Sequence, residues 1–133
     1  MLEKNMRFGD FIKRKRLEDP REITLNDMSK KLGISLSLLS DIENNRRKPF
    51  DADKIEIFAA FLELSEEDKA KLHDFAGRDR GEIPSDIEDI MMYEEIGKMA
   101  RFALRESKAG NVTEDDWKKF IREIEAKKKG DSL

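Results

Sequence analysis

The stretch TLNDMSKKLGISLSLLSDIENNRRKP, residues 24–49, is the most informative part of the sequence. Two short runs of apolar residues at helical spacing meet across a turn of about four residues, a length that brings two helices together at roughly 90–120°. Gly33 permits the positive φ that such a reversal needs, and the small Ser29 lies where the helices approach closely. The residues expected in the core beneath are Ile34, Leu39 and Ile42. The stretch therefore predicts two short helices that cross at a tight turn.

The same helical spacing continues through the whole chain, and no stretch alternates as a strand does. We therefore expect an all-α protein, with five helices in residues 1–76 and a helical extension in residues 77–133. The segment GRDRGEIP at 77–84, with two Gly and one Pro, is the best candidate for the boundary. The residues expected to begin the second to fifth helices are Thr24, Ser35, Asp51 or Asp53, and Ser65.

The outer side of the second short helix carries side chains of a kind suited to nucleic acid. Short polar or apolar side chains that fit base edges occupy this side: Leu36, Ser37, Ser40, Asp41, Asn44 and Asn45. Arg46, Arg47 and Lys48 follow at once, in a position suited to phosphates. A solvated charge run is the competing interpretation, but its place directly after this helix favours DNA.

This stretch resembles the helix-turn-helix of the Cro/cI repressor family, also called the xenobiotic-response-element family. The resemblance covers about residues 7–64 and combines features in one order: the Thr24 cap, small Ser29, Gly33, Ile34-Ser35, Leu39, Ser40, Ile42-Glu43 and a basic turn that ends in Pro49. It implies a lambda-repressor-like fold of five helices and a transcriptional regulator, more specifically a repressor. The helix at about 36–44 would read the major groove of double-stranded DNA.

The resemblance also implies roles for single residues. The base-reading positions are Leu36, Ser37, Leu38 and Asp41. The phosphate-binding positions are Thr24, Asn26 (where the family often has Gln), Asn44, Arg46, Arg47 and Lys48. Arg16 and Glu43 match a partly buried ion pair that joins the first and third helices. We expect Leu36 and Leu38 to be exposed, because Leu39 and Ile42 already occupy the inward side.

Two features leave alternatives open. Asp41 is acidic on a surface that would face phosphates. It would accept a hydrogen bond from cytosine, repel wrong sequences, or pair with a nearby Arg of the same chain. The loop at 19–23 is about two residues longer than is usual in the family, and its Arg21 would contact the DNA backbone or solvent.

The composition is consistent with a DNA-binding protein and gives no sign of catalysis. Residues 1–50 hold 12 Lys and Arg against 8 Asp and Glu, a charge of +4, and the remaining 15 basic and 22 acidic residues give −7. This asymmetry would orient the front half toward a polyanion. The chain has no Cys and one His, and no nucleophile lies beside a base. We expect no catalytic residue, metal or cofactor, and we expect His73 at the surface or at the rim of the core.

The extension is expected to bind protein. Its last amphipathic helix, begun by Thr113, places Trp117, Phe120, Ile121 and Ile124 on one stripe. The stripe would hold a homodimer together through residues beyond Pro84, or pack back on Leu72 and Phe75. Alternatively, residues 84–133 would neutralise a partner protein, as the antitoxins of toxin–antitoxin pairs do. No apolar run approaches a membrane span and no signal peptide begins the chain, which predicts a cytoplasmic protein, on the nucleoid when bound.

Overall fold

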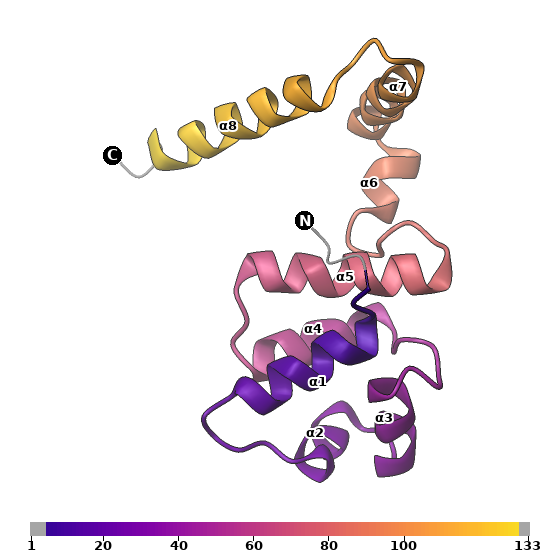
Figure 1. Ribbon diagram of the computed structural model, residues 1–133, viewed down its shortest axis with the longest axis vertical. Coiled ribbons are helices and arrows are strands. Elements are labelled where there is room, and N and C mark those ends of the chain that lie inside the picture. Colours follow the sequence, from indigo (N-terminus) through magenta and orange to yellow (C-terminus); the bar gives the residue numbers. More distant parts are fainter. Residues whose placement is uncertain (1–4, 131–133) are drawn as a thin grey trace. The chain divides into compact units, whose positions relative to one another are not determined.

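The computed structural model describes residues 5–130 and confirms an all-α fold, with no strand among these residues (Figure 1). The helices are α1 (Phe8–Glu18), α2 (Leu25–Leu32), α3 (Leu36–Glu43), α4 (Ala52–Phe61), α5 (Glu66–Arg80), α6 (Glu88–Tyr93), α7 (Glu95–Ala109) and α8 (Glu114–Gly130).

Side-chain caps begin the short helices at the residues that the sequence indicates. The side chains of Thr24, Ser35 and Ser65 each accept a hydrogen bond from a backbone N–H in the first turn of the helix that follows. Of the two candidates before α4, Asp51 is the cap. Gly33 ends α2 with a φ of 70°, a conformation that costs glycine little. Local polar chemistry therefore fixes where α2 and α3 begin and where the turn between them lies.

The first compact unit extends to residue 88, and its described residues, 5–88, surround a single apolar core. In this unit α5 packs on α1 and α4, while α3 packs on α1 and α2 (Figure 1). The Phe11 and Phe75 rings lie 5.3 Å apart between α1 and α5, and the Phe50 ring contacts those of Phe8 and Phe58. These aromatic contacts join α1, α4 and α5, and α2 and α3 pack on α4 and α1 respectively.

The helix α5 continues four residues beyond the boundary that the sequence suggests after residue 76. Gly77 is buried because the chain after α5 folds back over it, and a Cβ there would lie 2.8 Å from the Glu82 carbonyl oxygen. Asp79 accepts a hydrogen bond from the Phe8 backbone N–H at 3.2 Å. The end of α5 therefore belongs to the first unit, and the two compact units divide after residue 88.

His73 lies in the interior, so its expected position at the surface or rim is wrong. Its side chain is only 2% exposed, and its Nε2 lies 2.8 Å from Glu56 Oε2 of α4. This contact holds the pKa of Glu56 below its usual value, mainly through the hydrogen bond from the imidazole. A position beside the acidic Asp74 suggested exposure, but the packing of α4 against α5 covers the ring.

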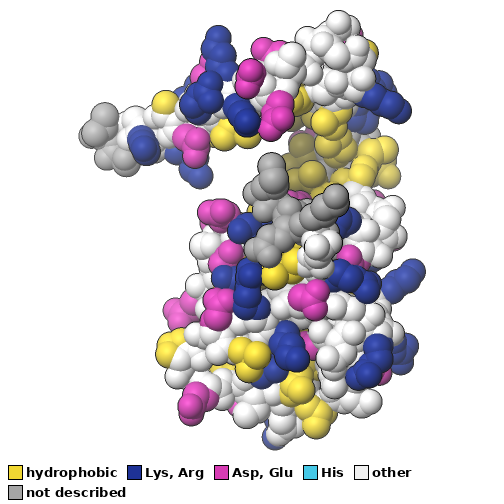
Figure 2. Space-filling model, viewed as in Figure 1, with side chains coloured by type: hydrophobic (Ala, Val, Ile, Leu, Met, Phe, Trp, Pro, Cys, Tyr) yellow, Lys and Arg dark blue, Asp and Glu magenta, His cyan; other side chains and the backbone are white. Residues whose placement is uncertain are grey.

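Residues 89–133 form the second compact unit, of which the structure describes residues 89–130. Gly97 of α7 lies against the end of α6, where a Cβ would be 2.1 Å from the Ile90 carbonyl oxygen. Arg101 donates a hydrogen bond to the Met91 carbonyl oxygen. Gly97 is the one buried residue within 89–130, and apolar side chains are open to solvent over α6 and α7 (Figure 2).

Candidate DNA-binding surface

The surface begins at the capped first turn of α2. Thr24 Oγ1 accepts from the Asp27 backbone N–H at 3.0 Å, and the Asp27 carboxylate accepts from the Thr24 N–H at 3.0 Å. The second bond lowers the pKa of Asp27. Thr24 and Asn26 are both exposed on this turn, while Ser29 is buried and donates to the Asn26 carbonyl oxygen. The two predicted contact residues therefore stand on a turn that is held from within.

The first turn of α3 presents Leu36 and Ser37 to solvent, with Leu36 48% exposed. Leu38 differs from the sequence-based expectation, because it is half-buried and packs against the core. The buried side of α3 is wider than the stripe formed by Leu39 and Ile42, as is common where a helix packs on a globular core. Leu38 therefore presents only part of its side chain to the outer surface.

Asp41 forms an ion pair with Arg46 of the same chain, one of the three roles left open for it. The Asp41 Oδ1 lies 3.4 Å from Arg46 Nε, and the Asp41 carbonyl oxygen accepts from the Arg46 N–H at 2.8 Å. Both side chains are still partly or well exposed. The acid thus holds the first cation of the basic turn beside α3.

The two asparagines after α3 have different surroundings. Asn44 is exposed, and its amide donates to the Ser40 carbonyl oxygen at 2.8 Å. Asn45 has a φ of 59° and ties this turn to α1. Its Oδ1 accepts from the Gly9 N–H and its Nδ2 donates to Asp10, both at 3.0 Å. Asn45 is therefore a positioning residue rather than part of the outer face.

Sequence reasoning missed this role, although an asparagine in a turn is one of the few residues that tolerate positive φ. Gly9 makes the contact possible, because a Cβ there would lie 2.2 Å from the Ile42 carbonyl oxygen. The start of α1 thereby supports the end of α3.

The basic turn itself is exposed and is fixed at both ends. Arg46, Arg47 and Lys48 are all exposed, between Asn45 on one side and the buried Pro49 on the other. Arg80 of α5 donates to the carbonyl oxygens of Pro49 and Phe50 at 2.7 and 2.5 Å. Three cations therefore project from a backbone segment that the domain holds in place.

A buried ion pair supports α3 from behind. Arg16 Nε and Nη2 donate to the two carboxylate oxygens of Glu43 at 2.8 and 3.0 Å, and Nη1 donates to the Ile23 carbonyl oxygen at 3.0 Å. Both side chains are less than 10% exposed. This fork joins α1, the loop before α2, and the end of α3, at the positions that the sequence assigns to it.

The loop at 19–23 is closed by Arg21 within the protein. Its guanidinium contacts Asp19 at 2.9 Å, donates to the Phe61 carbonyl oxygen at 2.7 Å and lies over the Phe61 ring. The hydrogen bonds from Arg21 lower the pKa of Asp19 to about 2. Arg21 is therefore engaged by the protein rather than presented on an open arm.

The described residues show neither a metal cluster nor a membrane span. No group of three or more His, Asp or Glu side chains in residues 5–130 is arranged to hold a metal ion. Within the same residues, no helix is both long and apolar enough to cross a bilayer.

Comparison with known proteins identifies the domain that carries this surface. A family model described as helix-turn-helix matches residues 12–69, from within α1 to the start of α5. No curated protein and no solved structure gives a significant match to the chain. The match spans α2, the Gly33 turn and α3, together with the helices that support them. Residues 12–69 therefore form a helix-turn-helix domain of the Cro/cI type, and the protein is a DNA-binding transcriptional regulator of that kind.

Proposed function

We propose that the protein is a sequence-specific repressor that reads the major groove of double-stranded DNA with α3. The observation that supports this most is the adjoining placement of an exposed first turn of α3 and an exposed basic turn, 46–48, held at both ends. Side chains at the start of a recognition helix contact base edges, while cations beside it contact phosphates and set the register on the duplex. A rigid support is what such readout requires.

The roles divide along these lines. Leu36, Ser37, the exposed part of Leu38 and Asp41 face base edges, where Leu36 is suited to thymine methyl groups. The phosphate contacts come from Thr24, Asn26, Asn44, Arg46, Arg47 and Lys48. Arg46 contacts Asp41 through Nε, and its guanidinium has further donors for a phosphate. The protein would act on the nucleoid in the cytoplasm.

Binding to random duplex DNA as a function of salt tests the phosphate contacts. Arg46→Ala and Arg47→Ala should each weaken binding to all sequences and flatten the salt dependence by roughly 0.9 in log–log slope, as expected for one phosphate. Lys71→Ala is the matched control, because it removes one cation from α5, outside α2, α3 and the basic turn. If the two Arg variants bind as tightly as the parent, the basic turn does not contact DNA.

Selection of bound sequences from random duplexes tests the base contacts. The parent should enrich one motif, and Ser37→Ala or Asp41→Ala should change the preferred base at one position of it by about 1–3 kcal/mol. Selection that enriches no motif would contradict sequence-specific readout.

A second candidate is an antitoxin-like protein, in which the extension neutralises a partner and the DNA-binding domain serves autoregulation. The observation that favours it is the exposed apolar surface of α7 and α8. A toxin-like reading frame beside the gene would support this function, whereas a divergent promoter with a palindrome would support the repressor. The palindrome would match a dimer whose recognition helices lie about 34 Å apart, one DNA turn.

A further inference from the structure

The last two helices leave large apolar side chains in water. Exposed fractions are 66% for Ile96, 65% for Phe102, 51% for Phe120, 52% for Ile121 and 41% for Ile124. Large exposed apolar side chains gathered on two neighbouring helices often mark a contact with another protein. The two helices cannot cover these side chains between themselves, since no side chain of α7 or α8 is buried.

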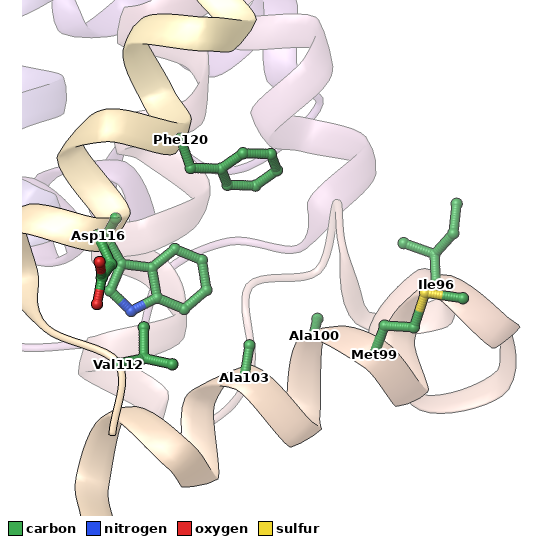
Figure 3. A pocket seen from close by; sticks show the side chains of 8 residues that line it. Ile96, Met99, Ala100, Ala103, Val112, Asp116 and Phe120 are labelled. Atoms are coloured by element: carbon green, nitrogen blue, oxygen red, sulfur yellow. The ribbon is translucent and has the colours of Figure 1, made fainter. Parts of the chain in front are cut away.

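The gap between α7 and α8 is an open apolar groove of about 470 Å³. Ile96, Met99, Ala100 and Ala103 line the α7 side, and Phe120 lines the α8 side (Figure 3). The small alanines on α7 leave room for a further helix to approach closely.

A hydrogen bond fixes the closed end of this groove. Trp117 Nε1 donates to Ser107 Oγ at 2.7 Å, which ties the start of α8 to the end of α7. The helices are therefore joined where the chain turns and are open along the rest of their length.

The sequence of α8 is nearly symmetric about its middle. Its stripe is Trp117, Phe120, Ile121 and Ile124, so the pairs 117/124 and 120/121 share one midpoint. Acidic residues fill the first turn (Glu114, Asp115, Asp116) and basic residues the last (Lys127, Lys128, Lys129). If two copies of α8 run antiparallel, Trp117 faces Ile124, Phe120 faces Ile121, and each acidic turn lies beside a basic one.

We propose that α8 pairs antiparallel with α8 of a second copy of this chain, and that α7 of each copy completes a four-helix bundle around the stripe. The charge pattern supports a second copy, because α8 is complementary to its own reverse and a two-fold contact joins the same surface on both chains.

This inference deepens the proposed function by assigning the surface that would join two recognition helices. The pairing needs no DNA, so sedimentation and cross-linking in the absence of DNA test it separately. A chain that dimerises but fails to select a DNA motif would contradict only the proposed function.

The absence of Cys makes a direct test possible with the full chain. Ile121→Cys places the thiol next to the two-fold axis, where the two copies come within disulfide reach, and mild oxidation should give a covalent dimer. Ala126→Cys on the far side of α8 should remain uncoupled. Lys128→Cys alone should also remain uncoupled, but a mixture of Glu114→Cys and Lys128→Cys chains should couple.

Disruption of the stripe gives a second test. Ile121→Asp should raise the dimer dissociation constant at least about 30-fold in sedimentation, since a central residue of a two-fold interface acts twice. Ala126→Asp adds the same charge on the far side and should leave the constant within about threefold.

Several outcomes would overturn the pairing. Self-coupling of Lys128→Cys as efficient as that of Ile121→Cys would indicate a parallel pair. A parent chain that is monomeric at high concentration would indicate that the stripe is covered by a different protein or by its own chain.

Discussion

The two compact units show how one sequence pattern has two structural outcomes. Phe58 of α4 and Phe120 of α8 both lie on amphipathic helices, yet Phe58 is fully buried and Phe120 is 51% exposed. In residues 1–88, five helices bring their apolar sides to one core. Within residues 89–130, the three helices α6, α7 and α8 bury no large apolar side chain. The comparison shows that amphipathic spacing predicts which side of a helix will be buried, but does not identify the surface that buries it.

The largest expected effect sharpens this contrast directly. Phe58→Ala should lower the free energy of unfolding of the first unit by about 3–5 kcal/mol, through lost burial and the cavity left behind. Phe120→Ala should change the unfolding free energy of the first unit by less than about 0.5 kcal/mol, because Phe120 belongs to the other compact unit. Urea unfolding followed by far-UV circular dichroism measures both. Equal effects would mean that α8 packs on the first unit.

The ion pairs of the two units should differ in the same direction. Glu43→Gln leaves the buried Arg16 guanidinium without its counter-charge and should cost about 3 kcal/mol. The counterpart in α8 is Glu114→Gln, which breaks the exposed contact of Glu114 with Lys118 at 3.3 Å and should cost less than about 0.5 kcal/mol. Thermal unfolding of both variants gives the comparison. A small effect of Glu43→Gln would show that water enters the space behind α3.

The helix caps offer a test in which the local geometry is the same. Thr113 and Asp116 exchange hydrogen bonds at the start of α8 as Thr24 and Asp27 do at α2. Thr24→Ala should lower the stability of the first unit by about 1 kcal/mol. Thr113→Ala should leave that unit unchanged and reduce the helicity of α8, which the fluorescence of Trp117, the single Trp, reports. If Thr113→Ala also lowers the stability of the first unit, the two units are energetically coupled.

The smallest expected effect is on the loss of stability at acidic pH. The pKa values of Asp27 and Asp116 both lie below the usual value, chiefly because each carboxylate accepts a backbone N–H from its threonine. A lowered folded-state pKa adds stability above the unfolded-state value near 3.8, and that stability disappears as pH falls through the folded-state value. Between pH 5 and 2, the stability of the first unit should fall less steeply in Asp27→Asn than in the parent. In Asp116→Asn, only the acid-dependent change in Trp117 fluorescence should become less steep. Unchanged acid profiles would contradict both bonds as sources of stability.

Much of the first unit could be predicted because its signals are local. A Thr or Ser cap bonds within the first turn of its own helix. Gly33 adopts the positive φ that the turn after α2 needs. The stripe of Leu39 and Ile42 follows from helical periodicity. These features need no knowledge of distant residues. The same holds for the helical class of the extension and for the stripe on α8.

The remaining features depend on residues that are distant in sequence. His73 is buried by α4, Leu38 is half covered by the core, and Asn45 is held by Gly9 and Asp10 of α1. Periodicity assigns one side of a helix to the core, but the width of that side depends on the neighbouring helices. The sequence also suggests a boundary at Gly77, before the end of α5. A glycine in such a segment indicates a linker, whereas in the structure Gly77 marks a close approach of the chain.

The sequence by itself determined the helical class, the caps, the turn at Gly33 and the family resemblance, because each rests on interactions within a few residues. Only the tertiary structure decided which polar side chains are presented. It paired Asp41 with Arg46, closed Arg21 onto Phe61 and Asp19, and fixed the basic turn between Asn45 and Arg80. It also left α7 and α8 uncovered, because the burial of an apolar stripe requires a second surface that periodicity along one helix does not specify.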